Sequence, residues 1–407
     1  MRVRGRFHTI AVAAALLGLV EVSSVANLQA ADEVRLGREG HATIPFDLRN
    51  QHLWIRGRVN GADSVWIVVD TGASSSVLDE GVARRLSIPL TAAGEAHGAG
   101  GSQRQYHARD VTVEIGGLQL RSSQMAALDL ASLAQTGGRA MQMVLGYELF
   151  RSSVVRFDYE RGLMDVWDRE HAPREQGGAT VPMTLVQNHP YVEATLYIPG
   201  RAPLGGRFVI DSGSSMSLIL TPEITQREKL LTAFPRTMVA IGRGVGGEVK
   251  NHLARADSFS IGGLTFDRPT VAMPDSSAGR ISVVGSIGNI GGQILGRCSV
   301  TFDYARQRIH LEPGPSFDRP FETDMSGFSF TRTPEGILVR VVNPDSPASQ
   351  AGLQVGDRIM QVDDQPADTI DPSVLRLQLQ KEGRTVRLRV QRGAETMEKT
   401  LTLRRLL

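Results

Sequence analysis

The chain has 407 residues, of which 41% are hydrophobic and 22% are charged, and its formal net charge is +2. This composition excludes a disordered polyelectrolyte and is sufficient for two or three domains with their own cores. Residues 1–30 begin with three arginines and continue into an apolar run, which predicts a signal peptide and therefore an exported, periplasmic or secreted protein. Without that segment the formal charge is zero, so no global attraction to nucleic acid or anionic lipid is expected.

No later stretch is apolar for long enough to cross a bilayer, so no stable membrane span is expected after removal of the signal. Cys298 is the single cysteine, which excludes an internal disulfide. It lies in an expected strand, and we interpret it as a small core residue.

One sequence pattern occurs twice in the chain. A β-branched run ends in Asp70-Thr71-Gly72-Ala73 and again in Asp211-Ser212-Gly213-Ser214. Glycine-rich blocks begin 28 and 33 residues after the two aspartates, at 98–101 and 244–247. Three more pairs recur in the same order: Ile115-Gly116-Gly117-Leu118 with Ile261-Gly262-Gly263-Leu264, Val144-Leu145-Gly146 with Ile294-Leu295-Gly296, and Phe157-Asp158-Tyr159 with Phe302-Asp303-Tyr304. The repetition predicts two related lobes, at 33–172 and 178–313.

Between the repeated blocks, apolar and polar residues alternate as they do in strands. Val111, Val113 and Ile115 show this period of two. Helical periodicity is confined to short pieces, at 80–86 and 222–231. We therefore expect a pair of all-β lobes with small helices.

The two aspartates follow apolar strands, where a charge is costly unless it is paired or hydrogen-bonded. Gly72 and Gly213 permit tight turns whose amides can point at the carboxylates. If the two loops face each other, Asp70 and Asp211 share one proton and titrate as a pair. Such a pair can activate a water with its ionised member and polarise a carbonyl with its protonated member, without a metal or other cofactor.

These loops resemble those of aspartic peptidases of the retropepsin-like branch, with both halves in one chain as in the pepsin-like bilobal form. The resemblance implies an aspartic-protease fold of two related β-barrel lobes, and endopeptidase activity on an extended polypeptide substrate. It makes Asp70 and Asp211 the catalytic residues and assigns the supporting loops to Thr71, Gly72, Ala73, Ser212, Gly213 and Ser214. The glycine-rich blocks resemble flap tips, at Gly98, Ala99, Gly100, Gly101, Gly244, Val245, Gly246 and Gly247. Val144-Leu145-Gly146 and Ile294-Leu295-Gly296 resemble the element that lies beneath each aspartate.

The two loops differ in one polar group. Ser214 is placed to donate a hydrogen bond to Asp211, whereas Ala73 has no such group for Asp70. This difference predicts that Asp211 carries the charge and Asp70 the proton. An Ala73→Ser variant should then shift the activity profile to lower pH.

Other functional motifs are weak or missing. The segment 242–247 fits the G-x-G-x-x-G dinucleotide pattern, but no βαβ series surrounds it, and a hairpin tip is the preferred interpretation. The sequence has no His-Glu-x-x-His pair and no Gly-x-Ser-x-Gly elbow, so a metal site or a serine hydrolase is unsupported. His97, His107 and His252 lie near the expected flaps and are interpreted as surface residues.

Residues 322–407 resemble a PDZ domain of the bacterial, protease-associated type, a small α+β domain. The resemblance rests on Ser326-Gly327-Phe328, Gly336-Ile337-Leu338-Val339, Ser346-Pro347-Ala348 and Gly356-Asp357-Arg358-Ile359. It implies that a peptide or a protein C-terminus binds as an added strand. The expected peptide-binding residues are Gly327, Phe328, Ser329, Phe330, Leu375 and Leu379.

The leading interpretation is an exported bacterial aspartic endopeptidase with a PDZ domain that recruits or senses protein tails. The rival interpretation is a peptide-binding adaptor of the envelope, in which the lobes no longer cleave. A PDZ domain that only stabilises the lobes is a further alternative.

Overall fold

The computed structural model describes residues 33–62, 64–133, 139–275, 279 and 285–407. The predicted signal peptide lies outside these residues. The chain divides into two compact units, with the boundary between Phe321 and Glu322. None of the helices within the described ranges has the length and apolar character needed to span a membrane.

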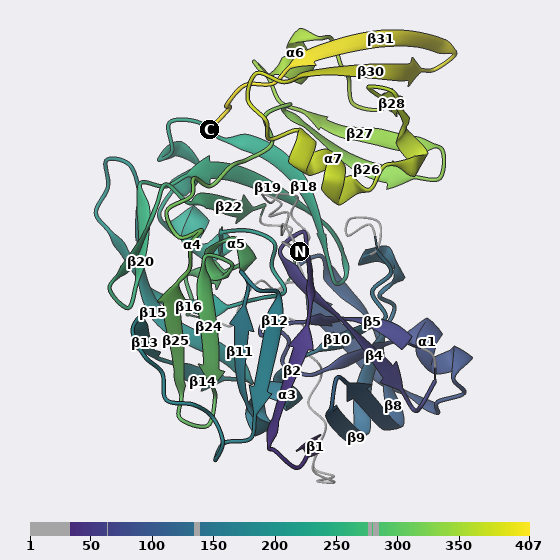
Figure 1. Ribbon diagram of the computed structural model, residues 1–407. Coiled ribbons are helices and arrows are strands. Elements are labelled where there is room, and N and C mark those ends of the chain that lie inside the picture. Colours follow the sequence, from purple (N-terminus) through teal and green to yellow (C-terminus); the bar gives the residue numbers. More distant parts are fainter. Residues whose placement is uncertain (1–32, 63, 134–138, 276–278, 280–284) are drawn as a thin grey trace, which may run out of the picture. The chain divides into compact units, whose positions relative to one another are not determined.

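The first lobe is built on a nine-stranded sheet (Figure 1). Its order is β1-β9-β6-β10-β5-β4-β8-β7, with β3 beside β4, and β8 pairs with β9 as well as with β4. The second pairing of β8 closes the sheet into a barrel. The strands are β1 (Glu33–Leu36), β3 (Asp47–Arg49), β4 (His52–Val59), β5 (Ser64–Val69), β6 (Val77–Asp79), β7 (Leu90–Gly98), β8 (Gly101–Ile115), β9 (Leu118–Leu128) and β10 (Met143–Leu145).

The second lobe repeats this plan with a ten-stranded sheet. Its order is β18-β19-β22-β17-β23-β16-β15-β20-β21, with β14 beside β15. In each lobe a short strand lies between a parallel and an antiparallel neighbour: β10 between β5 and β6, and β23 between β16 and β17. The strands are β14 (Thr184–Val186), β15 (His189–Tyr197), β16 (Leu204–Ile210), β17 (Leu218–Leu220), β18 (Met238–Gly244), β19 (Gly247–Arg255), β20 (Ser258–Ile261), β21 (Leu264–Asp267), β22 (Thr270–Pro274) and β23 (Gly288–Ile290).

A third sheet joins the two halves of the chain. Its six strands run in the order β13-β25-β24-β11-β12-β2, and β11 of the first half pairs antiparallel with β24 of the second. The repeated Phe-Asp-Tyr blocks lie on these two central strands, and the Phe157 and Phe302 rings are 5.2 Å apart between centroids. The strands are β2 (His41–Pro45), β11 (Val154–Asp158), β12 (Leu163–Trp167), β13 (Ala179–Pro182), β24 (Cys298–Asp303) and β25 (Arg308–Pro313).

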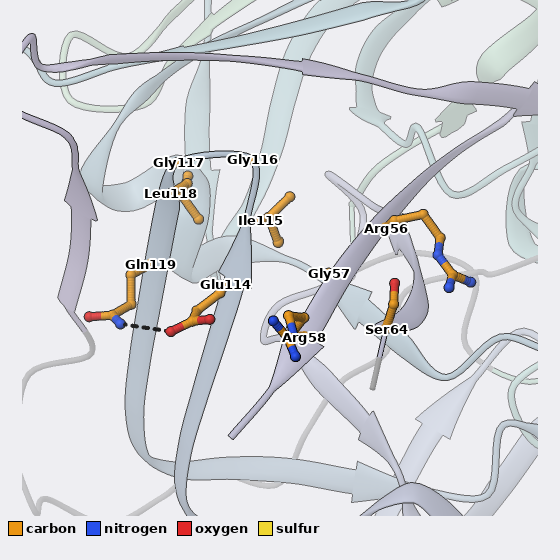
Figure 2. A pocket seen from close by; sticks show the side chains of 10 residues that line it. All are labelled: Arg56, Gly57, Arg58, Ser64, Glu114, Ile115, Gly116, Gly117, Leu118 and Gln119. Carbon is orange, nitrogen blue, oxygen red and sulfur yellow. Dashed lines mark hydrogen bonds between the residues drawn. The ribbon is translucent and has the colours of Figure 1, made fainter. Parts of the chain in front are cut away.

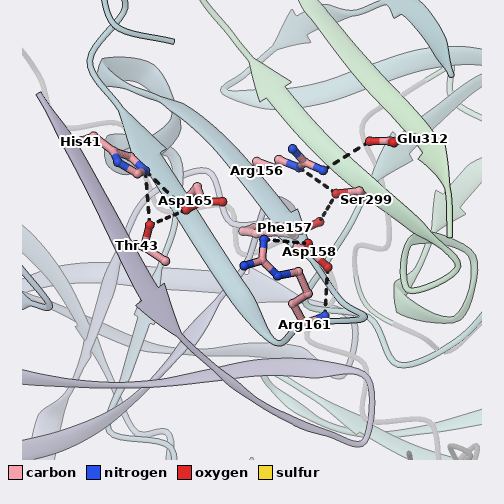
Figure 3. A network of polar contacts seen from close by, with 9 residues as sticks. All are labelled: His41, Thr43, Arg156, Phe157, Asp158, Arg161, Asp165, Ser299 and Glu312. Atoms are coloured by element: carbon pink, nitrogen blue, oxygen red, sulfur yellow. Dashed lines mark hydrogen bonds and ion pairs between the residues drawn. The ribbon is translucent and has the colours of Figure 1, made fainter. Parts of the chain in front are cut away.

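Polar side chains link neighbouring strands of this joint sheet (Figure 3). Arg156 on β11 donates to Ser299 Oγ on β24 at 2.8 Å and pairs with Glu312 on β25 at 3.3 Å. On the other side of β11, Thr43 donates to Asp165 at 2.6 Å. The halves are therefore linked by side chains as well as by main-chain ladders.

The helices of the lobes are short, as the sequence predicts. Asp79 accepts the Val82 amide at 3.0 Å and starts the first, and Thr221 with Pro222 starts another. They are α1 (Glu80–Arg85), α3 (Tyr147–Ser152), α4 (Pro222–Arg227), α5 (Gly292–Leu295) and the single turns η1 (Ala131–Leu133) and η2 (Leu230–Thr232).

Alternation along the strands places one face of each sheet in a core. Val111, Val113 and Ile115 are at most 1% exposed, as their spacing predicts. Cys298 is buried in the same large apolar cluster, at 3% exposure. The described lobes are therefore held together by apolar packing and main-chain ladders.

The second unit is a six-stranded sheet with two short helices. Its order is β26-β27-β28-β30-β31, with β29 beside β28, so β26 is an edge strand. The elements are β26 (Phe328–Thr333), β27 (Gly336–Val342), α6 (Pro347–Gln350), β28 (Arg358–Val362), β29 (Gln365–Pro366), η3 (Ala367–Thr369), α7 (Pro372–Gln378), β30 (Thr385–Arg392) and β31 (Glu395–Thr402). The predicted fold class, two all-β lobes followed by a small α+β domain, is confirmed.

Candidate active site

The two Asp-(Thr/Ser)-Gly loops occupy equivalent places in the two lobes. Asp70 follows β5, and its amide donates to the Leu145 carbonyl of β10 at 3.0 Å. Asp211 follows β16, and its amide donates to the Ile290 carbonyl of β23 at 2.9 Å. Each aspartate is therefore fixed at the end of a buried strand by the short strand beside it.

The hydroxyl residues that follow the aspartates connect the loops to each other. The Thr71 amide donates to Ser212 Oγ at 3.0 Å, and the Ser212 amide donates to Thr71 Oγ1 at 2.9 Å. Each hydroxyl in turn donates to a carbonyl of the opposite strand, Ile210 at 2.8 Å and Val69 at 3.0 Å. These four reciprocal bonds hold the loops face to face.

This arrangement brings the Asp70 and Asp211 carboxyl groups together, and both residues are 0% exposed. The two groups are close enough for one to donate a hydrogen bond to the other. A Cβ added to Gly72 would lie 2.6 Å from Asp211 Oδ1 and 3.2 Å from Asp70 Oδ1. A Cβ on Gly213 would clash with the Asp70 carboxyl. Glycine is therefore required in both loops because each passes directly against the opposite acid.

Burial raises the pKa of both acids. It raises the pKa of Asp70 to about 7, although the Gly72 amide, which donates to the Asp70 carboxylate at 2.7 Å, opposes the rise. The pKa of Asp211 is also raised, first by burial and then by the charge of Asp70. Two such acids titrate as a coupled pair, which holds one proton between its two ionisation steps.

Asn289 introduces an asymmetry that the sequence did not reveal. Its Nδ2 donates to Asp211 Oδ2 at 2.9 Å, which opposes the rise in the Asp211 pKa. Val144 is the equivalent residue beside Asp70, because Val144 pairs with Val68 and Asn289 with Val209. At this position a hydrogen-bond donor therefore lies beside Asp211, and an apolar valine lies beside Asp70.

Two expectations from the repeat are corrected by this register. The hydroxyl of Ser214 accepts the Met216 amide at 3.3 Å, and the hydrogen bond to Asp211 that the sequence led us to expect from Ser214 comes from Asn289. The segment beneath Asp211 is 289–291, and 294–296 lies instead on and after α5. Asn289 interrupts the apolar-apolar-glycine pattern in the segment 289–291. The sequence pattern was therefore matched to 294–296, the next run of two apolar residues and a glycine.

A second pair of supporting residues, Glu148 and Gln293, lies two positions after Gly146 and Gly291. Ser76 donates to Glu148 Oε2 at 2.7 Å, and in the other lobe Ser217 donates to Gln293 Oε1 at 2.6 Å. Glu148 also accepts the Ser76 amide at 2.6 Å. The repeated Gly-x-(Glu/Gln) spacing in the sequence is the signal that identifies this pair.

His52 supports the loop of the opposite lobe. Its Nε2 lies 2.9 Å from the Gly213 carbonyl, and its side chain is buried. His189 is its counterpart in the second lobe, at 0% exposure, and burial lowers the pKa of His189 to about 4. The paired segments His52-Leu53-Trp54 and His189-Pro190-Tyr191 are a further repeat that sequence reasoning missed.

The two glycine-rich blocks are hairpin tips, and they contact each other. The segment 98–101 joins β7 to β8, and 244–247 joins β18 to β19. The Gly100 amide donates to the Val245 carbonyl at 2.9 Å. The G-x-G-x-x-G pattern at 242–247 therefore lies on an antiparallel hairpin, as preferred from the sequence, and does not open a helix.

Close packing at these tips depends on small residues. A Cβ on Gly98 would lie 2.6 Å from Val245 Cβ. Ala99 and Val245 are 0% and 2% exposed, so each tip is covered by its surroundings. Tyr106, farther along the first hairpin, packs against the barrel core.

The other histidines near the hairpins make peripheral contacts. His252 lies 2.8 Å from Asp275, and partial burial lowers the pKa of His107. Within the described residues, no group of three or more His, Cys, Asp or Glu side chains is arranged to hold a metal ion.

An open hollow of about 760 Å³ lies elsewhere on the first lobe (Figure 2). It is lined by the β8–β9 turn and the neighbouring strands, at Arg56, Gly57, Arg58, Ser64, Glu114, Ile115, Gly116, Gly117, Leu118 and Gln119. Neither aspartate lines it, so it is separate from the acid pair.

The expected peptide-binding residues of the second unit lie on β26, its approach and α7. Leu375 and Leu379 are 1% and 0% exposed and pack in the core with Phe328 and Phe330. Ser329 is half-buried on the edge strand. Ser329 therefore lies at the edge of the sheet, and the two leucines lie beneath the surface.

Asp324 organises the loop that leads into β26. Its Oδ1 accepts the amides of Ser326 at 2.8 Å and Gly327 at 3.0 Å. Burial raises the pKa of Asp324 to about 6. Arg376 of α7 stands 4.9 Å over the Phe330 ring and attracts the Asp324 charge.

Comparison with known protein families finds a match in each of the two units. Residues 55–149 and 194–291 match the aspartyl protease family, and residues 338–392 match the PDZ domain. No curated protein matches the chain. Among solved structures, the crystal structure of aspartic proteinase from Irpex lacteus is similar with a TM-score of 0.41 and 12% identity, covering 69% of this chain and 98% of that chain.

Proposed function

We propose that this chain, which carries the aspartyl protease family sequence in both lobes and a PDZ domain after them, is an aspartic endopeptidase. The observation that carries the proposal is the pair of buried carboxyl groups, Asp70 and Asp211, held face to face by the reciprocal bonds of Thr71 and Ser212. A merely structural pair of acids at this position would be costly, because their charges repel and are shielded from water.

The raised pKa values give the pair an acid and a base in one site. The ionised member accepts a proton from a water molecule, and the protonated member donates a hydrogen bond to the carbonyl of the scissile peptide. The water oxygen then attacks the carbonyl carbon. The C–N bond breaks as the proton taken up by the base passes to the leaving nitrogen, and a carboxyl group and an amine result. Asn289 favours the ionised form of Asp211, so we assign the role of base to Asp211 and that of acid to Asp70.

The PDZ domain is proposed to bind peptides or protein C-termini by strand addition. The free edge of β26 supports this role, because its main-chain groups are available for a further strand. The arginine-led apolar segment at 1–30 supports export to the periplasm or beyond.

Digestion of casein and of a peptide library tests the hydrolytic proposal. The purified protein should cleave, and Asp70→Asn and Asp211→Asn variants should lose at least 1,000-fold in kcat, on the order of the loss when a proton-transfer group is removed. Exposed Asp257→Asn is the matched control and should retain full activity. Equal cleavage by all four proteins would reject the proposal.

The rival function is a peptide-binding adaptor that uses the same fold without cleavage. The intact acid pair favours the enzyme. If the protein binds library peptides, and neither it nor its variants cleave them over the pH range 3–8, the adaptor is the better description.

A further inference from the structure

Two buried amide side chains occupy equivalent positions on the two hairpins. Gln105 is four residues after the tip glycine Gly101, and Asn251 is four residues after Gly247. Both are 0% exposed. Within the described residues, neither polar atom of the Gln105 side chain has a hydrogen-bond partner, and Asn251 Oδ1 also has none. Leaving such groups unpaired in a folded protein is unfavourable, so this duplicated arrangement calls for a ligand.

Strand register places Gln105 on the face of the first lobe that carries the acid. Gln105 is two residues before His107 on β8 and therefore shares its face. His107 pairs with Ala126, which pairs with Val77, which pairs with Val144. Val144 belongs to the short strand that fixes Asp70. Before Asp110, whose φ of 53° interrupts the alternation along β8, the opposite face carries Ala108 and Tyr106, which pack in the barrel core. The Gln105 side chain is therefore directed away from the barrel core.

The same reasoning applies to Asn251 in the second lobe. Asn251 is two residues before Leu253 on β19, and Leu253 pairs with Ala272. Ala272 pairs with Ile219, which pairs with Asn289, the residue that donates to Asp211. The two amides therefore lie on the two sheet faces that carry the acid pair, one on each side.

The surroundings of Gln105 are apolar. The small cluster on this face contains the loop residue Ala73, the strand residue Val144, and Val245 from the tip of the opposite hairpin. Gln103, which faces the same way as Ala96, also has an unpaired Nε2. Uncharged donors and acceptors on an apolar wall select uncharged hydrogen-bonding groups and disfavour charged ones.

We propose that Gln105 and Asn251 bind uncharged amide or hydroxyl groups of the peptide substrate, one on each side of the scissile bond. This inference rests on the proposed peptidase function and deepens it by naming the chemistry of two substrate contacts. The partner groups have two sources, the main-chain amides of the substrate or the side chains of Asn, Gln, Ser and Thr.

Gln105→Leu and Asn251→Leu test the proposal, because leucine keeps the approximate volume and removes both polar atoms. Each variant should lose roughly 3- to 10-fold in kcat/KM, mainly through KM, as expected for one uncharged hydrogen bond. Its melting temperature should be unchanged or higher, since an unpaired buried amide is removed. Gln119→Leu, at the other end of the β8–β9 pair, is the control and should match the unchanged protein in kcat/KM. A structural role alone would lower the melting temperature and leave substrate preference unchanged.

A position-scanned peptide library separates the two sources. If side chains are bound, the unchanged protein prefers Asn, Gln, Ser or Thr at one position on each side, and each variant loses one preference. If main-chain amides are bound, the loss is equal for all sequences. Variants with the kinetics and preferences of the unchanged protein would overturn the inference.

Binding of the same peptides to Asp70→Asn protein, followed by fluorescence polarisation, keeps this test independent of cleavage. In that background Gln105→Leu and Asn251→Leu should weaken binding by the same factor as they raise KM. Failure of cleavage alone rejects the peptidase proposal, whereas unaltered binding by both leucine variants rejects the role of the two amides.

Discussion

Asn289 donates a hydrogen bond to Asp211 at 2.9 Å, and the equivalent place beside the other acid is occupied by a valine. A donor stabilises the ionised carboxylate. Replacing it in Asn289→Val should therefore raise the lower pKa of the pair and move the acid limb of the kcat/KM profile to higher pH by about 1 unit. The measurement is kcat/KM from pH 3 to pH 8.

The matched control for this change is Val144→Ala, which alters packing at the equivalent position without touching a donor. Its acid limb should stay in place even if its melting temperature falls. Val144→Asn should move the acid limb to lower pH, because the new amide offers a hydrogen-bond donor to the ionised form of Asp70. An acid limb that is unmoved in folded Asn289→Val would contradict the assignment of Asp211 as the base.

The acid pair also predicts how stability depends on pH. A carboxyl group whose pKa is raised by folding stabilises the folded state below its unfolded pKa, and this contribution is lost as the pH rises through the folded pKa. Burial raises the pKa of Asp70 to about 7 and raises that of Asp211 as well, so the free energy of unfolding should fall as the pH rises from about 4 through 7. Asp211→Asn should flatten this dependence and make the protein more stable than the unchanged protein at pH 8. Chemical denaturation at several pH values measures it, and Asp257→Asn, an exposed change, should leave the slope as it is.

The contact between hairpin tips should be sensitive to a single methyl group. A side chain at Gly98 would meet Val245, with its Cβ at 2.6 Å from that of Val245. Gly98→Ala should therefore separate the tips and lower kcat/KM by about 10-fold, through loss of substrate positioning, with a small change in melting temperature. Gly37→Ala is the control, because a Cβ there meets no atom within 4 Å. Equal kcat/KM in the two variants would show that the tip contact is dispensable.

Arg297 fixes the segment that follows the last strand of the joint sheet. Its guanidinium lies 3.5 Å from the centroid of the Phe321 ring, and burial lowers the pKa of Arg297 to about 10. Its donors reach the main-chain carbonyls of Ser316, Phe317, Arg319 and Pro320. Lysine cannot reproduce this planar set of donors, so Arg297→Lys should lower the free energy of unfolding by about 2–3 kcal/mol.

Limited proteolysis gives an independent measure of the same contact. Chymotrypsin should cut Arg297→Lys protein after Phe317 or Phe321 several-fold faster than the unchanged protein. Arg227→Lys, whose side chain is 66% exposed, is the control. Equal cutting rates would mean that the segment is held by other contacts.

The repeated motifs were sufficient to predict the two lobes and the pairing of their loops. A β-branched run before each Asp-(Thr/Ser)-Gly predicts a buried strand that ends at an acid, and Thr71 and Ser212 bond across as their positions suggest. The hairpin tips at 98–101 and 244–247 could also be predicted, because each glycine-rich block follows its acid at a similar spacing and lies between strand-like segments. The local sequence pattern was sufficient at positions where the residue types alone determine the backbone conformation.

Asn289 shows where local pattern was insufficient. Its role depends on the register between β16 and β23, which aligns it with Val209, and no feature of the segment 288–291 reveals that register. The apolar-apolar-glycine pattern pointed instead to 294–296, which is helical. Leu375 and Leu379, which the sequence predicts as peptide-binding residues, are nearly fully buried, and the strands that cover them are distant in sequence.

The joint sheet makes each half of this chain structurally incomplete without the other. β11 pairs with β24, which follows the whole second lobe in the chain, so one edge of β11 lacks its native partner until the second half folds. A folding intermediate with only the first half in place therefore has an open strand edge, at which wrong strand pairing can begin.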